Sequence, residues 1–133
     1  MAGLICDIVT PQKKLFSDEA TLVTVPGTEG DMGFLAGHVP LVSALADGAV
    51  RVTNEDVVKT YACHGGYVEV DGQKVIVLAD RAALVDDIDA ADVQSKLAEY
   101  ESKLDALDAE DPECLLVSED IAWCKTMLKA IGA

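Results

Sequence analysis

The feature that most limits the fold of this chain is a change in the spacing of its apolar residues near residue 86. Before that point apolar and polar residues alternate in short runs, as in LICDI at residues 4–8, with the period of two that is typical of half-buried β-strands. After it, apolar residues recur at steps of four and three, which places them along one stripe of a helix. The chain is therefore predicted to be α+β, with strands first and helices second.

Turn signals divide the first part into many short strands. They recur roughly every eight to twelve residues, a spacing typical of a sandwich or barrel rather than of alternating βαβ units. Lys13 and Lys14 are expected in a turn after the first strand. Asp71-Gly72, between YVEV and KVIVL, predicts a hairpin in which these two residues form the turn. We therefore expect an antiparallel β-sandwich over residues 1–86.

Two apolar seams occupy the last third of the chain. Asp89 and Ser118 are the expected N-caps of two helices, because short polar side chains accept hydrogen bonds from the first free N–H groups. Pro112 predicts a loop between the helices. Matched seams joined by a short loop are best buried against each other, so residues 87–133 are predicted to form an antiparallel hairpin. The seams are Val93, Leu97, Tyr100, Leu104 and Leu107, then Val117, Ile121, Cys124, Leu128 and Ile131.

The segment VPGTEGDMGFLAGHVPLVSAL, residues 25–45, interrupts the strand pattern. It holds four glycines and two prolines, so the chain must turn repeatedly there. Glu29, Asp31 and His38 lie between the turns, on what we expect to be a rigid exposed loop. We interpret this loop as a docking surface. The alternative is that Glu29 and Asp31 are solvated turn residues and that His38 caps its own turn.

Charge and cysteine usage exclude several classes of function. The net charge is −14, which argues against nucleic acid or anionic lipid as a direct partner. The four cysteines form no C-x-x-C pair and are expected to be reduced, and a zinc site built on Cys63 and His64 is disfavoured because metal-ligand spacing is missing. No apolar run reaches the ~20 residues that span a bilayer. We find no nucleophile elbow or phosphate-binding glycine loop, and expect no cofactor, no metal and no catalytic residue.

The glycine-rich segment, followed by GAVRV at residues 48–52, GGYVEV at 65–70 and VIVLA at 75–79, resembles the epsilon subunit of bacterial F-type ATP synthases. The resemblance runs through the whole chain in the same order and includes the terminal helices. It implies a non-catalytic subunit that couples proton-driven c-ring rotation, through gamma, to ATP synthesis. It also implies a peripheral position at the cytoplasmic face of the bacterial cell membrane.

The resemblance further implies contact surfaces for three partners. The hairpin is expected to regulate the enzyme, with the catalytic beta subunit as its partner. For the two histidines, a local structural role is an equally open interpretation. The residues matching the c-ring contact are Glu29, Gly30, Asp31 and His38, and those matching the gamma contact are Thr10, Ser43 and His64.

Two departures from the family pattern bear on regulation. Relatives that bind ATP carry Ile/Leu-Asp-x-x-Arg-Ala at the first helix, whereas this chain has Ile88, Asp89 and then Asp92 in place of the arginine. Replacing a guanidinium with a carboxylate removes a phosphate ligand and adds repulsion, so we expect weak or absent ATP binding. The alternative, an ATP-sensing hairpin, is disfavoured for the same reason. The second helix offers only Lys125 and Lys129 as basic groups, so charge-based inhibition is expected to be weak.

Overall fold

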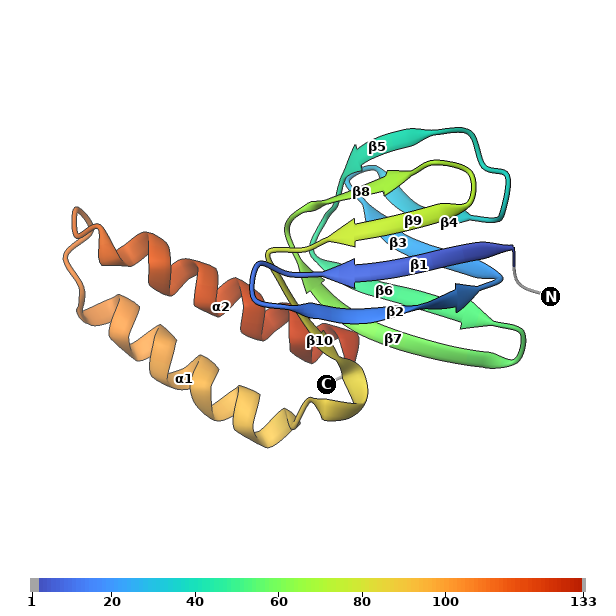
Figure 1. Ribbon diagram of the computed structural model, residues 1–133. Helices are drawn as coiled ribbons and strands as arrows, with labels where there is room; N and C mark the ends of the chain where they lie inside the picture. Colours follow the sequence, from blue (N-terminus) through green and yellow to red (C-terminus); the bar gives the residue numbers. More distant parts are fainter. Residues whose placement is uncertain (1–2, 133) are drawn as a thin grey trace.

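The structure, a computed structural model, describes residues 3–132 as two packed β-sheets followed by two helices (Figure 1). The predicted sandwich and helical hairpin are confirmed. One sheet contains β1 (Leu4–Val9), β2 (Lys14–Ala20), β5 (Leu41–Ala44), β8 (Tyr67–Val70) and β9 (Lys74–Leu78). The other contains β3 (Leu22–Gly27), β4 (Gly30–Phe34), β6 (Gly48–Asn54), β7 (Val57–His64) and β10 (Arg81–Leu84). A 3₁₀ turn, η1 (Val85–Asp87), leads to α1 (Ala90–Ala106) and α2 (Glu113–Ala130).

The strand order is β2–β1–β9–β8–β5 in the first sheet and β10–β7–β6–β3–β4 in the second. Strand pairs are antiparallel with one exception within the described residues, β1 beside β9, which run parallel with Cys6 opposite Val75. A parallel pair needs a long crossover, and here the chain builds four of the five strands of the second sheet between the two strands, with β10 following β9. The fully antiparallel expectation is therefore corrected at this pair.

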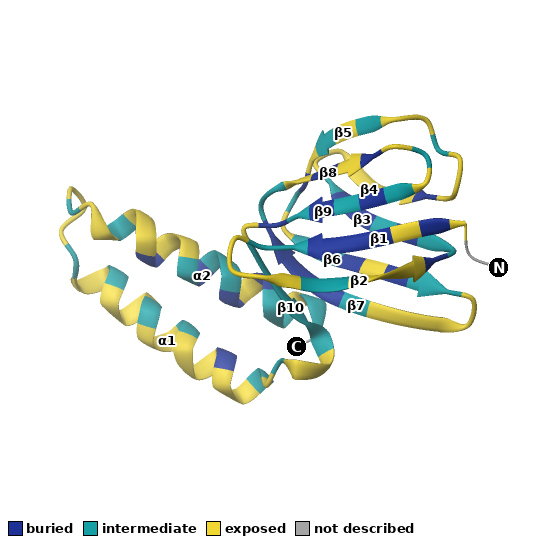
Figure 2. Cartoon of the chain, in the orientation of Figure 1, coloured by how far each residue is buried: buried dark blue, intermediate teal, exposed yellow. Residues whose placement is uncertain are grey.

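The core lies between the two sheets and is mostly aliphatic. Every second side chain of a strand points into the core. In β1, Leu4, Cys6 and Ile8 are each at most 1% exposed, while Ile5 is 44% exposed. Figure 2 shows the buried residues gathered on the strands and along one side of the helices. Burying each large aliphatic side chain contributes about 1.5–3 kcal/mol, so this layer is the main source of the sandwich's stability.

The β8–β9 hairpin differs by one position from the predicted turn. The Asp71 N–H donates to the Lys74 carbonyl over 3.1 Å, which leaves Gly72 and Gln73 at the tip. The Asp71 carboxylate accepts from the N–H groups of Gln73 and Lys74 at 3.1 and 2.8 Å. Gly72 takes a φ of 97°. Asp71 therefore precedes the two tip residues and stabilises the turn with its side chain, which accepts hydrogen bonds from the backbone N–H groups of the turn.

Strand β2 and the start of α2 were not predicted correctly. Lys14 begins β2 instead of lying in the turn, which is closed by Thr10 N–H donating to the Lys13 carbonyl at 2.9 Å. Helix α2 begins at Glu113, so Ser118 is an exposed residue inside the helix and not its N-cap. Pro112 lies at the N-cap position, because a proline is tolerated at a helix start where no N–H partner is needed.

The hairpin packs against one end of the sandwich through α2. Helix α2 contacts β7 and β6, and α1 packs mainly on α2 (Figure 1). The closed end of the hairpin, residues 107–112, projects away from the sheets (Figure 1). Asp89 caps α1 as predicted, with its carboxylate accepting from the N–H groups of Ala91 and Asp92 at 3.0 and 3.3 Å.

Candidate docking surfaces and the hairpin junction

The acidic part of the glycine-rich segment forms the tip of the β3–β4 hairpin. Gly27 pairs with Gly30, which leaves Thr28 and Glu29 as the turn. A Cβ on Gly27 would lie 2.5 Å from the Gly30 carbonyl oxygen, so the tip closes tightly only around a glycine. Glu29, Gly30 and Asp31 are exposed. The expected exposed loop over residues 25–45 is therefore wrong for much of its length, since β4 and β5 both lie within it.

His38 lies away from this tip. It follows Phe34, the last residue of β4, and that strand carries the chain ~13 Å away from Gly30 at ~3.3 Å per residue step. Its Nδ1 lies 2.7 Å from the Val39 carbonyl oxygen, and its ring packs edge-on against Phe34 with centroids 5.0 Å apart. The structure thus brings Glu29, Gly30 and Asp31 together and places His38 in a separate loop, residues 35–40.

The three residues predicted to face gamma have three different surroundings. Thr10 lines a shallow hollow with Tyr67 and Leu78, at the edge of the outer face of the first sheet. Ser43 lines another hollow beside Glu29, near the acidic tip. His64 is buried beneath α2. The sequence match therefore does not translate into one continuous surface in this arrangement of the hairpin.

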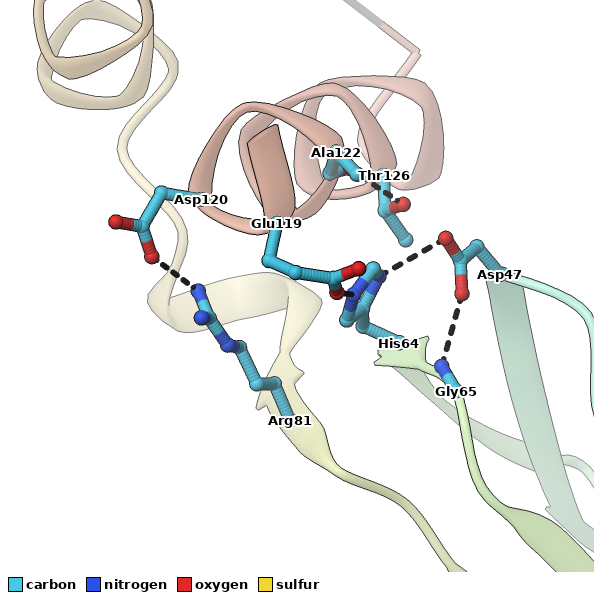
Figure 3. Close-up of polar contacts among 8 residues, drawn as sticks. All are labelled: Asp47, His64, Gly65, Arg81, Glu119, Asp120, Ala122 and Thr126. Carbon is cyan, nitrogen blue, oxygen red and sulfur yellow. Dashed lines mark hydrogen bonds and ion pairs between the residues drawn. The ribbon is translucent and has the colours of Figure 1, made fainter. Parts of the chain in front are cut away.

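His64 is the centre of the junction between sandwich and hairpin (Figure 3). Its Nε2 lies 2.7 Å from Glu119 Oε2 on α2. Its Nδ1 lies 2.9 Å from Asp47 Oδ2, close enough for an ion pair although not aligned as a hydrogen bond. Asp47 is itself fixed, because its Oδ1 accepts from the Gly65 N–H at 2.8 Å. Beside this cluster, Arg81 Nη1 and Asp120 Oδ1 form an ion pair at 2.8 Å.

Two glycines after β7 aim His64 at the helix. Gly65 and Gly66 take φ angles of 65° and 96°, which turn the chain sharply at the strand end. A Cβ on Gly66 would lie 1.8 Å from the Leu78 carbonyl oxygen, so the backbones of β9 and this turn pack directly on each other. The local turn chemistry was readable in the sequence, whereas the partners of His64 were not.

Hydrogen bonding and charge at the junction favour an ionised Glu119. The hydrogen bond from His64, followed by its charge, lowers the pKa of Glu119, and Arg81 adds to the effect. The Trp123 ring lies 6.3 Å from the His64 ring and covers the same end of the sandwich. Trp123 therefore faces the chain's own sandwich in this arrangement of the hairpin.

The residues of the degenerate ATP motif are engaged within the helix they begin. The Asp89 carboxylate caps α1, and Asp92 forms an exposed ion pair with Lys96 at 3.3 Å. Ile88 is half-buried just before the cap. The N-terminal turn therefore presents carboxylates where a phosphate ligand would need cationic groups.

Burial determines the ionisation of the cysteine thiols. Cys6, Cys63 and Cys124 are buried, Cys114 is half-buried, and all four are free thiols. Burial raises the pKa of both Cys6 and Cys63 to about 12. Within residues 3–132 no three His, Cys, Asp or Glu side chains are grouped so as to hold a metal ion. Neither α1 nor α2 is long and apolar enough to span a membrane.

The chain thus combines an acidic hairpin tip, an aliphatic β-sandwich and a helical hairpin joined to the sandwich by ion pairs. Residues 4–85 match the family described as the β-sandwich domain of the ATP synthase delta/epsilon chain. The ATP synthase epsilon chain of Desulforudis audaxviator is 43% identical over 76% of this chain and 74% of its own length. That of Magnetococcus marinus is 35% identical over 94% of this chain and 91% of its own. The chain belongs to the family of ATP synthase epsilon chains, as the sequence resemblance indicated.

A solved structure supports the fold over nearly the full length. A chain in the Euglena gracilis mitochondrial ATP synthase has a TM-score of 0.69 to this chain. The alignment covers 99% of this chain and 79% of that one, with 22% sequence identity. At that identity the likeness concerns the fold alone, and it includes the helical hairpin as well as the sandwich.

Proposed function

We propose that this chain is a rigid coupling subunit in the central stalk of a bacterial F-type ATP synthase. In this role it joins gamma to the polar loops of the c-ring at the cytoplasmic face of the cell membrane, and it helps pass proton-driven rotation to the catalytic head. The observation that carries the proposal is the family match across the sandwich that holds the acidic tip. A close-packed aliphatic interior suits the role, because it deforms little under load.

The β3–β4 tip is the proposed c-ring contact. Glu29, Gly30 and Asp31 are exposed together at the end of a hairpin whose closure is tight. Asp31 pairs with Arg51 at 3.7 Å across exposed surface, an ion pair worth only ~0–1 kcal/mol, so a partner's cation can replace Arg51 at little cost. His38, which we expected at the same contact, lies beyond β4 and is proposed to shape the loop at residues 35–40 instead.

The outer face of the first sheet is the proposed gamma contact. Ile5, Val42 and Tyr67 are 44%, 67% and 45% exposed on its strands, and Thr10 lies at its edge. Apolar groups gathered on one face of a sheet are typical of a protein interface. Ser43 lies nearer the acidic tip, and His64 becomes available to gamma only when α2 leaves the sandwich.

The two proposed roles of the chain, docking and regulation, belong to its strand-rich and helical parts. We propose that residues 1–86 dock the subunit and that residues 87–133 regulate it, with the beta subunit as the partner of the projecting hairpin. Leu115 and Leu116 are 76% and 67% exposed near its closed end, which supports an apolar contact there. Electrostatic inhibition remains weak in this proposal, because α2 offers only Lys125 and Lys129 as basic groups.

Binding of reconstituted gamma tests the proposal. We expect Tyr67→Asp to weaken capture of gamma by at least tenfold, because it places a charge in an apolar interface. The matched control is Val57→Asp, which adds the same charge at a residue 62% exposed on the second sheet. Equal loss for both variants, or failure of the unmodified chain to bind gamma and the c-ring, would contradict the proposal.

A further inference from the structure

The contact between sandwich and α2 is centred on one buried imidazole with an acid at each nitrogen. The His64 side chain is 8% exposed, and its two nitrogens lie 2.7 and 2.9 Å from carboxylate oxygens of Glu119 and Asp47. An imidazole has two N–H groups only when it is protonated. A neutral ring would therefore set a nitrogen lone pair against one of the two carboxylates.

We propose that a proton on His64 holds the helical hairpin against the sandwich, so that docking weakens as the pH rises. Asp47 belongs to the sandwich and Glu119 to α2, and the protonated ring bridges them. Loss of the proton leaves a neutral ring between two like charges. Because the bridge to both carboxylates needs an N–H on each ring nitrogen, acid favours docking by linkage.

The other charged groups near the ring do not provide the positive charge that bridges Asp47 and Glu119. Asp47 is held by the Gly65 N–H at either charge state of the ring. Arg81 and Asp120 form a separate ion pair across the same junction, so this pair does not depend on the charge of the ring. By element, the charged groups near β7 at this end are Asp47 before β6, Asp80 just before β10, Arg81 at its start, Asp87 on η1, and Glu119, Asp120 and Lys129 on α2, where Lys129 lines one groove with Asp47.

The ionisation of Glu119 sets an acid limit to the same contact. The hydrogen bond from His64 and the charge of its ring lower the pKa of Glu119. A group whose pKa is lowered by a contact stabilises that contact above its titration and loses the effect as the pH falls through it. Docking should therefore be strongest between the titrations of Glu119 and His64 and decline on both sides.

The full-length chain carries its own reporters for this equilibrium. Trp123 is the only tryptophan, and its ring lies near His64. Ala130 on α2 and Ala49 on β6 line one groove together with Asp47, so their methyl groups report docking at a second point on the junction. The measurement is nuclear magnetic resonance of the isolated chain from pH 5 to 9, following the histidine ring nitrogens, the Trp123 indole and the Ala49 and Ala130 methyl groups. Because it needs no other subunit, its outcome does not depend on the proposed function.

We expect His64 to be doubly protonated in the docked form. Above its titration the docking equilibrium constant should fall by up to about tenfold per pH unit, as one released proton allows. His64→Gln should remove this dependence, and His38→Gln, which changes the only other histidine, should leave it intact. Glu119→Gln, at an exposed helix position that tolerates substitution, should flatten it as well. The proposal is overturned if docking does not change with pH, strengthens as pH rises, or keeps its pH dependence in Glu119→Gln or a folded His64→Gln.

Discussion

The close approach at Gly66 makes a quantitative prediction about stability. Gly66→Ala places a Cβ 1.8 Å from the Leu78 carbonyl oxygen, while observed Cβ contacts are essentially never below 3.0 Å. The end of β9 must therefore move by about 3.0 − 1.8 = 1.2 Å. Gly37→Ala is the matched control, because its φ of 85° is close to the 96° of Gly66 but nothing lies within 4 Å of the added Cβ.

The two variants separate backbone strain from overlap. Both alanines take a left-handed conformation that costs roughly 1–2 kcal/mol, and only Gly66→Ala adds an overpacking cost of about 1–3 kcal/mol or more. We expect unfolding free energies lower by ~1–2 kcal/mol for Gly37→Ala and by about 4 kcal/mol for Gly66→Ala. For a chain of this size the latter should lower the melting temperature by roughly 10–15 °C.

Urea unfolding followed by Trp123 fluorescence and by far-ultraviolet circular dichroism measures both quantities. The circular dichroism signal gives the two unfolding free energies. Trp123 lies on α2, so its fluorescence reports the junction, which Gly66→Ala should disturb because the turn positions His64. Costs equal to within ~0.5 kcal/mol for the two variants would refute the reasoning, since overlap with Leu78 would then contribute nothing.

Four further measurements follow from the structure. Isothermal titration should detect no micromolar ATP binding, because the first turn of α1 is acidic; a micromolar affinity would contradict this. Deleting residues 87–133 should raise ATP hydrolysis by the assembled enzyme only slightly, and a large rise would show that inhibition does not need basic residues on α2. Burial opposes ionisation of Asp7, but hydrogen bonds from Ser17 and Lys74 and two lysine charges outweigh it and lower the pKa of Asp7. Its stabilisation is therefore present above the ordinary carboxyl range and lost as pH falls through it, so Asp7→Asn should flatten the acid side of the stability profile. Of the four thiols, Cys114 should react fastest with a thiol reagent at pH 8, because burial keeps Cys6 and Cys63 un-ionised; rapid reaction of all four in the folded chain would contradict that burial.

The parts of the fold that sequence predicts are those set by neighbours along the chain. The change of apolar period gave the order of strands and helices, and Asp89 was identified as a cap from its own position. β2 was missed because KLFSDEA is an edge strand whose charged side chains face solvent, so its pattern is weakly apolar. The start of α2 was misplaced because Pro112 was interpreted as a loop residue when it begins the helix.

The candidate site was predictable only where it is local. The acidic tip follows from glycines next to Glu29 and Asp31. The junction does not, because His64 and Glu119 are 55 positions apart, Asp47 precedes β6 and Arg81 begins β10. No short-range pattern encodes such an assembly, and the pairing of β1 with β9 was out of reach for the same reason.

The parallel pairing of β1 with β9 determines how much of the chain must be synthesised before the sandwich can fold. β1 lies inside its sheet, and the strand on its far side is not complete until residue 78 has been synthesised. A nascent chain that has made only β1 and β2 exposes one unpaired edge and cannot close its core, which makes it vulnerable to aggregation on the ribosome. Truncation before β9 should therefore abolish folding, whereas stopping after η1 leaves every strand with its partners.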